Sequence, residues 1–285
     1  MDSILRQCGD GENKAGFKEH QEPATVVLSS GATKTTALQF STASRKAAFS
    51  LVELLVVVAI IGILAGLLLP VLARSKEKAK RLLCMNNLRQ VNLVLRLYAD
   101  SNNEKLPQMN AGLWAWDVPW KVGDTMVQSG ALQKIFYCAS SGFTAQDNLN
   151  LWNFIPNKYR AVGYAMTFPG TASVLFTNQN SSMLPQPMTD AKTGITYPAP
   201  SPSGRVVMAD AVISQPHNAD EANRWLNSYI NIKGGYWRLH QTAHLEKTMP
   251  AGGNLGMLDG HAEWRKFQNM HVRTDPTSSS PIFWW

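Results

Sequence analysis

The sequence predicts an α+β protein in which a long, kinked N-terminal helix packs on an antiparallel, β-rich head. Residues 49–73 are apolar apart from Glu53, and at about 1.5 Å per residue a helix over this range reaches roughly 37 Å, more than the ~30 Å hydrocarbon layer of a bilayer. Residues 79–98 place apolar side chains at steps of three and four, as one face of a helix does. Beyond residue 107, short apolar runs alternate with loops rich in Gly and Pro.

The N-terminal part divides into three segments. Residues 1–48 form a leader whose Ser, Thr, Gly and charged residues predict a disordered chain. Residues 49–73 form the transmembrane helix, and residues 74–100 form its amphipathic continuation. Pro70 lacks an amide hydrogen, so we expect a kink near it. The polar run that begins at Asp100 predicts the end of the helix.

Residues 101–285 are expected to form the globular head. Three apolar runs predict strands in it, over 131–138, 163–168 and 205–210. The clearest local signal is a C-terminal hairpin near 254–267. There Asp259 and Gly260 predict a two-residue turn, because glycine tolerates the positive φ that such a turn requires.

A specific arrangement of residues surrounds the start of the apolar segment. Basic Arg45 and Lys46 precede a small pair that ends at Ala48, then come aromatic Phe49 and, inside the apolar run, Glu53. This arrangement resembles the processing signal of type IV prepilins and type II secretion pseudopilins, although that family favours Gly where this chain has Ala48. The resemblance implies that a prepilin peptidase cuts between Ala48 and Phe49 and then N-methylates Phe49.

Glu53 needs a partner, because a carboxylate inside a membrane span costs about 2.5–3.5 kcal/mol on insertion scales. Cleavage would create a cationic amine at Phe49. If subunits stagger along an assembly axis, the amine of one subunit can meet Glu53 of the next, and the pair offsets the desolvation of both charges. Glu53 is therefore interpreted as an assembly and register residue. The alternative is an ordinary signal anchor in which Glu53 snorkels toward the headgroups.

The resemblance implies a structural subunit of a type IV pilus-like or type II secretion pseudopilus filament, without enzymatic activity. The implied partners are the prepilin peptidase, other pilin or pseudopilin subunits, the inner-membrane assembly platform and membrane lipid. The implied location is the bacterial inner membrane, crossed once, with the leader in the cytoplasm and the head in the periplasm or on a filament. More Lys and Arg residues follow the span than precede it, which favours the opposite orientation. The processing signal takes precedence, because the peptidase acts on the cytoplasmic side.

Segment 84–90, in the amphipathic helix, and His244 followed by Asp259-Gly260, in the C-terminal part, form a second pattern. They resemble a group of large prepilin-like proteins that carry a His…Asp-Gly element and are abundant in planctomycete and verrucomicrobial bacteria. The interval between His244 and Asp259 is longer than is usual in that group.

Cys84 and Cys138 are the cysteines that remain once a leader containing Cys8 is removed. In an oxidising periplasm they could form a disulfide, and two unpaired buried thiols are the alternative. No metal site is expected, because the chain lacks Cys-x-x-Cys and Cys/His spacings. Calcium bound by loop carboxylates, as in major pseudopilins, is the one cofactor left open, although the chain has no dense run of Asp and Asn to hold it.

The remaining polar residues do not form a recognisable catalytic pattern. Motifs of nucleophilic enzymes and phosphate loops are missing. The candidate acid–base or metal residues lack a spacing that would bring them together; they are Asp210, His217, His240, His244, Asp259 and His261. The net charge of +7 is not clustered with aromatic residues, so no nucleic-acid partner is expected.

Nine tryptophans are more than an average core requires. Most are expected in the core, with Trp114, Trp116 and Trp120 as candidates for an exposed binding loop. That loop supports an alternative function of a different class: a signal-anchored envelope protein that binds carbohydrate or protein partners without polymerising. The C-terminal residues 283–285 are expected either to dock on the head or to form an exposed apolar tail.

Overall fold

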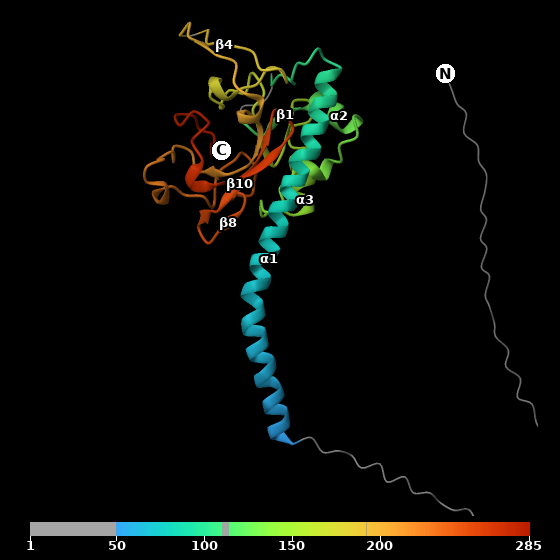
Figure 1. Ribbon diagram of the computed structural model, residues 1–285, viewed down its shortest axis with the longest axis vertical. Coiled ribbons are helices and arrows are strands. Elements are labelled where there is room, and N and C mark those ends of the chain that lie inside the picture. Colours follow the sequence, from blue (N-terminus) through green and yellow to red (C-terminus); the bar gives the residue numbers. More distant parts are fainter. Residues whose placement is uncertain (1–49, 110–113, 192) are drawn as a thin grey trace, which may run out of the picture. The chain divides into compact units, whose positions relative to one another are not determined.

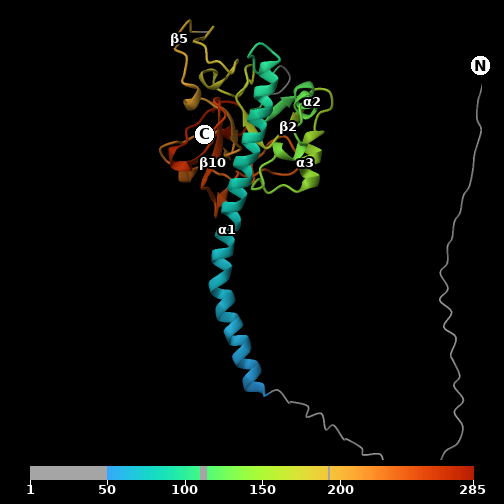
Figure 2. The same cartoon turned by 45° about the vertical axis from the view of Figure 1, so that its right-hand side comes forward.

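The computed structural model describes residues 50–109, 114–191 and 193–285 (Figures 1 and 2). The predicted leader and the residues on both sides of the predicted cleavage site lie outside these ranges. The helices are α1 (Leu51–Asp100), α2 (Trp120–Gln128) and α3 (Ala145–Trp152), with short 3-10 helices η1 (Gln133–Phe136), η2 (Phe176–Asn178), η3 (Pro202–Gly204), η4 (Arg224–Leu226) and η5 (Phe267–Asn269). The strands are β1 (Asp117–Pro119), β2 (Tyr159–Ala161), β3 (Tyr164–Met166), β4 (Met188–Thr189), β5 (Thr196–Tyr197), β6 (Val206–Asp210), β7 (Ile213–Ser214), β8 (Leu245–Glu246), β9 (Met249–Pro250), β10 (Gly252–Met257), β11 (Ala262–Lys266) and β12 (Ile282–Phe283).

The α+β class is confirmed. Helix α1 is continuous and carries Pro70 in its interior, so the proline does not end the helix; a kink at Pro70 stays a prediction. The helix ends at Asp100, where the chain turns through left-handed conformations at Asn103 and Glu104, with φ of 56° and 62°. The Glu104 amide donates to the carbonyl of Ala99 over 2.8 Å, which satisfies one of the acceptors that a helix end leaves free.

A four-stranded antiparallel sheet forms the centre of the head, in the order β11-β10-β6-β3. Strands β10 and β11 form the hairpin that contains Asp259 and Gly260 (Figure 1). The loop between them is longer than the predicted two-residue turn. The Met257 amide donates to the His261 carbonyl and the Gly260 amide donates to the Met257 carbonyl, and Gly260 adopts a φ of 98°. A three-residue loop that ends in a left-handed glycine fits this pattern.

The strand predicted over 131–138 is wrong. Its central part is the 3-10 helix η1, and the following residues Tyr137 and Cys138 are buried with Ile135 and Phe136. Consecutive buried side chains lack the alternation of a half-buried strand, and a short apolar run does not by itself separate strand from helix.

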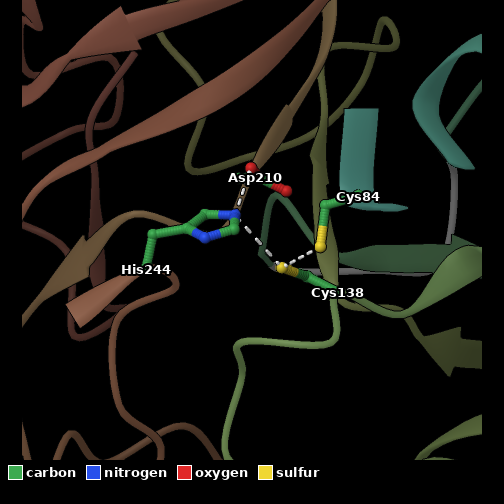
Figure 3. Close-up of side chains that lie close together, drawn as sticks. All are labelled: Cys84, Cys138, Asp210 and His244. Atoms are coloured by element: carbon green, nitrogen blue, oxygen red, sulfur yellow. Dashed lines mark hydrogen bonds and ion pairs between the residues drawn. The ribbon is translucent and has the colours of Figure 1, made fainter. Parts of the chain in front are cut away.

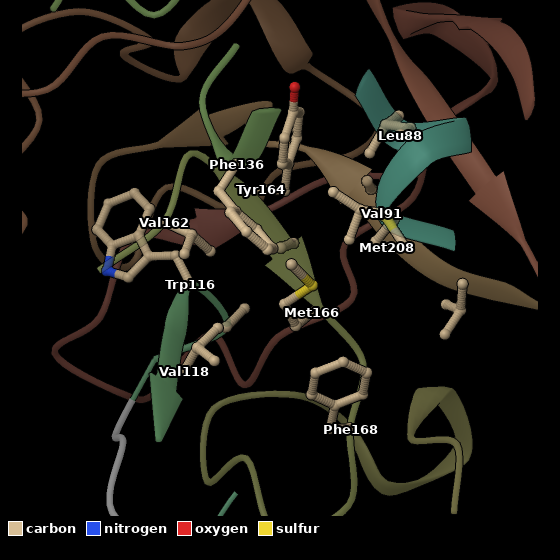
Figure 4. Close-up of a cluster of buried hydrophobic side chains, with 14 of the residues drawn as sticks. Leu88, Val91, Trp116, Val118, Phe136, Val162, Tyr164, Met166, Phe168 and Met208 are labelled. Atoms are coloured by element: carbon tan, nitrogen blue, oxygen red, sulfur yellow. The ribbon is translucent and has the colours of Figure 1, made fainter. Parts of the chain in front are cut away.

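The core of the head includes one face of the second half of α1. Cys84, Leu88, Val91, Leu95 and Ala99 are each 0% exposed, and their spacing of three and four residues places them along one stripe of the helix. In Figure 4, Leu88 and Val91 project from α1 into a cluster with side chains of β3 and β6. The amphipathic half of α1 is therefore an integral part of the head.

The tryptophans are not distributed between the core and the surface as the sequence predicted. Trp116 is buried, and Trp114 and Trp120 are partly buried, so these three do not form an exposed loop. The most exposed tryptophans are instead Trp225 and Trp237. The C-terminal aromatic residues dock on the head: β12 pairs with β7, and Trp284 and Trp285 are buried.

Candidate functional site

The start of α1 is closed by hydrogen bonds between Ser50 and the first turn. The Ser50 amide donates to Glu53 Oε2 over 2.9 Å, and the Val52 amide donates to Ser50 Oγ over 3.2 Å. This Ser-x-x-Glu arrangement is similar to a capping box, which satisfies amides that a helix start leaves unpaired. Glu53 thus has a local structural role that the sequence analysis did not identify.

The first half of α1 presents an apolar surface without a protein partner. Within the described residues, α1 is the one helix long and apolar enough to cross a membrane, and its most apolar 18-residue window has a mean hydropathy of 3.0 and is 0% buried. The large apolar side chains from Leu54 to Leu72 are exposed. A Cβ atom added at Gly62 or Gly66 would meet nothing within 4 Å. This surface needs lipid or other helices to cover it.

Polar contacts join the second half of α1 to the head. Asn92 Nδ2 donates to the carbonyl of Met257 at the end of β10 over 2.6 Å. Asn254, in the same strand, donates through Nδ2 to the Arg81 carbonyl over 3.1 Å. The Arg81 guanidinium lies 4.4 Å from the centre of the Trp264 ring. These contacts fix the position of α1 along the sheet more specifically than apolar packing alone can.

Four buried side chains meet where α1 contacts the head: Cys84, Cys138, Asp210 and His244 (Figure 3). We call them the Cys–His–Asp cluster. The two sulfur atoms lie 2.6 Å apart, and both cysteines are free thiols in the structure. His244 Nε2 lies 3.0 Å from Asp210 Oδ2 and 3.5 Å from Cys138 Sγ. One atom from each residue falls within 4.8 Å of the others.

Each member of the cluster comes from a different segment. Cys84 begins the buried stripe of α1, and Cys138 follows η1. A Cβ atom on Gly163 would lie 3.0 Å from the Cys138 amide nitrogen, so this glycine permits the close approach of the two segments. Asp210 ends β6, and His244 precedes β8 with a φ of 52°, a left-handed conformation in which histidine is enriched.

Both ring nitrogens of His244 face carboxylate oxygens. Nδ1 lies 2.8 Å from Glu77 Oε1 on α1, and Nε2 faces Asp210 Oδ2 on the sheet. An ionised carboxylate oxygen can only accept, so both nitrogens donate and the ring is an imidazolium. Burial alone lowers the pKa of His244, but the hydrogen bond to Asp210, with further contributions from Cys84 and Glu77, raises this pKa to about 10.

The two cysteines differ in acidity. The hydrogen bond with Cys138 is the largest influence on Cys84 and lowers its pKa to about 6, against the opposing effect of burial. Burial is the largest influence on Cys138 and raises its pKa well above the ordinary value. Asp210 Oδ2 also accepts from the amide and the side-chain nitrogen of Asn254, over 2.7 and 2.8 Å, whereas Asp210 Oδ1 has no hydrogen-bond partner.

The structure unites some of the polar residues considered in the sequence and separates others. Asp210 and His244 meet each other and the two cysteines, whereas Asp259 and His261 pair with each other on the exposed β10–β11 turn. His217 contacts the carbonyl of Pro276. The sequence analysis considered the pair Cys84 and Cys138, whose sulfurs the structure brings together. It missed their meeting with Asp210 and His244, because these residues are far apart in the chain.

The head also contains an aromatic cavity of about 230 Å³. Trp114, Trp116, Phe143, Phe154 and His240 contribute to its walls. The His240 ring stacks on Trp116 with ring centres 4.6 Å apart, and its Nε2 atom is buried without a hydrogen-bond partner. Burial lowers the pKa of His240 to about 4, so this ring is neutral at pH 7.

One comparison with known proteins gives a match. Residues 43–69 match the family model described as the prokaryotic N-terminal methylation motif. No curated protein and no solved structure matches the chain significantly. The match covers the predicted processing site and most of the apolar half of α1.

Proposed function

Because the chain carries a type IV prepilin- and pseudopilin-like processing signal, we propose that it is a structural subunit of a type IV pilus-like or type II secretion pseudopilus filament. The signal marks the chain as a pilin- or pseudopilin-type protein. Prepilin peptidase would cut between Ala48 and Phe49 and methylate Phe49. The chain would be a substrate of that enzyme and would catalyse no reaction itself.

The observation that carries this proposal is the division of α1 into two environments. From Leu54 to Leu72 the large apolar side chains are exposed, whereas from Cys84 to Ala99 one face of the same helix is buried in the head. The apolar half suits lipid before assembly and neighbouring helices after it, because packing between helices can replace lipid contacts at little net cost. In this proposal the leader is cytoplasmic and the head is periplasmic or displayed on a filament.

The proposed assembly partners follow from the same half of the helix. Neighbouring pilin or pseudopilin subunits would cover its apolar surface, and an inner-membrane platform would extract it from lipid. Glu53 would receive the methylated amine of the adjacent subunit, while the Ser50 cap holds the start of the helix in place. We expect this function to need no cofactor, with calcium bound by loop carboxylates as the one alternative that the sequence leaves open.

The test is the mature N-terminus of the protein expressed in cells with and without an active prepilin peptidase. Mass spectrometry should find N-methyl-phenylalanine at Phe49 only where the peptidase is active. Shearing and electron microscopy should then find the processed chain in filaments, and co-expression with other pilins supplies the required partners. A chain that stays uncut beside an active peptidase would contradict the proposal.

The aromatic cavity favours a second candidate function, that of a signal-anchored envelope protein that binds carbohydrate or a protein partner without polymerising. Aromatic faces such as Trp114 stack on sugar rings or on partner side chains, and this cavity contains several of them. Binding of an oligosaccharide by the purified full chain, abolished by Trp114→Ala and unaffected by loss of processing, would support this candidate over filament assembly.

A further inference from the structure

We propose that Cys84 and Cys138 form a disulfide in the exported protein and that this bond fastens α1 to the head. The two sulfur atoms already lie in contact, at 2.6 Å, and come from residues separated by 54 positions. One belongs to α1 and the other to the segment after η1. The bond itself does not depend on filament assembly, whereas its mechanical role rests on the proposed function.

A metal ion is the competing explanation for the same four side chains. The unpartnered oxygen of Asp210 favours a metal, because it points toward the cysteines (Figure 3) and could act as a ligand. His244 opposes a metal, because both of its ring nitrogens face carboxylate oxygens, at 2.8 and 3.0 Å. An imidazolium that donates through both nitrogens has no lone pair to offer.

The sulfur atoms also oppose a metal. Two cysteine sulfurs on one tetrahedral zinc ion lie about 3.8 Å apart, given zinc–sulfur bonds of about 2.3 Å. The sulfurs of Cys84 and Cys138 are much closer than that. Both carboxylates also have cationic partners without an ion, since the imidazolium lies between Glu77 and Asp210 and the Arg81 guanidinium pairs with Glu77. A covalent bond between the sulfurs leaves this ionic arrangement intact.

The bond requires an oxidant from outside the chain. We assign this role to a protein disulfide donor of the thiol–disulfide oxidoreductase class. One cysteine thiolate attacks the donor's disulfide and forms a mixed disulfide; the second thiolate then attacks that bond and releases the donor as a dithiol. Two electrons pass to the donor, and the two cysteine protons are lost to the donor or to solvent. Cys84 and Cys138 are 0% and 1% exposed, so the exchange occurs before α1 and the head have closed over them.

The place of Cys84 in α1 gives the bond a mechanical role. Cys84 is the first buried residue of the helix, and the contacts of α1 with the head that precede it include those of the partly exposed Glu77 and Arg81. Asp100, where the chain turns back, is roughly 24 Å further along at about 1.5 Å per residue. Tension on the apolar half of α1 would first break the polar contacts of Glu77 and Arg81 with the head and then open the buried stripe from Cys84 onward. A covalent bond at Cys84 blocks the opening of this stripe at its first residue.

The experiment uses the full-length chain, exported in cells and purified in detergent. The protein is denatured in the presence of a maleimide, with and without prior reduction, and then digested for mass spectrometry. We expect a Cys84–Cys138 linked peptide, and we expect both residues to be labelled only after reduction. Zinc is measured in the same sample by elemental analysis.

Variants separate the bond from other effects. Cys84→Ser and Cys138→Ser should each abolish the linked peptide and lower Tm by roughly 10 °C, as expected for a loop of this length in a protein of this size. Cys8→Ser is the matched control, and Glu77→Gln, which removes the ionic contact with His244, should leave the linked peptide intact. Full labelling of both thiols in unreduced wild-type protein overturns the proposal, and one equivalent of bound zinc with both thiols reduced replaces it with the metal site. If the linked peptide is found in protein that never assembles, the proposed filament function is refuted and the disulfide proposal is supported.

Discussion

Substitutions at Glu53 can separate its two roles, because Gln keeps one of them and loses the other. In the structure Glu53 Oε2 accepts from the Ser50 amide over 2.9 Å. The side-chain oxygen of Gln can accept in the same way, and capping boxes use either residue. Glu53→Gln therefore preserves the helix start and removes the charge. Glu53→Ala removes both, and Ser50→Ala removes the bond from the Val52 amide while it leaves the charge in place.

The expected magnitudes differ enough to be measured. Loss of a helix cap costs about 0.5–2 kcal/mol. Loss of one partner from a buried ion pair costs about 3–5 kcal/mol, because the other charge is left without compensation. If the Phe49 amine of a neighbouring subunit is that other charge, Glu53→Gln should weaken subunit addition by at least roughly a hundredfold, since about 1.4 kcal/mol corresponds to a factor of ten.

The charge of Glu53 also affects membrane insertion of the isolated subunit, and there its removal is favourable. Removing a carboxylate from the membrane span recovers an insertion cost of about 2.5–3.5 kcal/mol. Glu53→Gln should therefore enter the membrane at least as well as wild type, be cleaved and methylated normally, and still fail to assemble. Ser50→Ala should assemble at close to the wild-type level.

The assay compares the three variants in one strain with an active peptidase. Membrane fractionation measures insertion, mass spectrometry of the N-terminus measures processing, and the sheared fraction measures assembly. Wild-type assembly of Glu53→Gln together with failure of Glu53→Ala would refute the reasoning, because that result assigns the role of Glu53 to the helix cap.

Three further predictions concern the head. Gly252→Ala should destabilise the protein by more than about 2 kcal/mol in urea unfolding, because the new Cβ atom would clash with the Arg265 carbonyl oxygen. Gly204→Ala is the control and should be close to neutral, because a Cβ atom there meets nothing within 4 Å. Between pH 6.5 and 4, His240→Phe should lose about 3 kcal/mol less stability than wild type. The unfolded chain protonates His240 near pH 6.5 and the folded chain only near pH 4, so this residue lowers stability as the pH drops through the window, whereas carboxylates with a lowered pKa, such as Asp147, contribute equally in both proteins. Arg160→Lys should lower Tm although it keeps the charge. The planar guanidinium lies over the rings of Trp120 and Trp152, 3.5 and 4.4 Å from their centres, and an ammonium cannot stack in this way. An unchanged Tm would exclude this stacking as a source of stability.

The sequence predicts the parts of this protein that depend on neighbours along the chain. The apolar run after Phe49, the stripe that contains Leu88 and Val91, and the glycine turn at Gly260 all follow from short-range periodicity or backbone preference, and the structure contains each of them within the described residues. The run at 131–138 was assigned to the wrong element, because a few consecutive buried residues carry no period that separates strand from helix.

The Cys–His–Asp cluster could not be predicted in the same way. His244 and Glu77 are separated by 167 positions and His244 and Asp210 by 34, and their meeting depends on how β6, β10 and α1 pack. The interpretation of Asp210 as the end of a strand was correct, but it gave no indication that this carboxylate would be buried beside an imidazolium. Long-range polar pairs of this kind become visible only when the topology is known.

The two halves of α1 need different properties, and Pro70 and Gly66 help to explain how one helix can have both. Pro70 removes the amide that would donate to the carbonyl of Gly66, four residues earlier, so that carbonyl is left without its helical partner within the apolar half of α1. Gly66 has no side chain and an open surface around it, which leaves space for another chain or a water molecule to approach the free carbonyl. We therefore expect the apolar half to bend near Pro70 and to exchange partners, whereas the half from Cys84 onward is fixed by buried apolar residues and by Asn92. A filament subunit requires both properties in the same helix, since its assembly surface must adapt to a new environment while its head keeps one position.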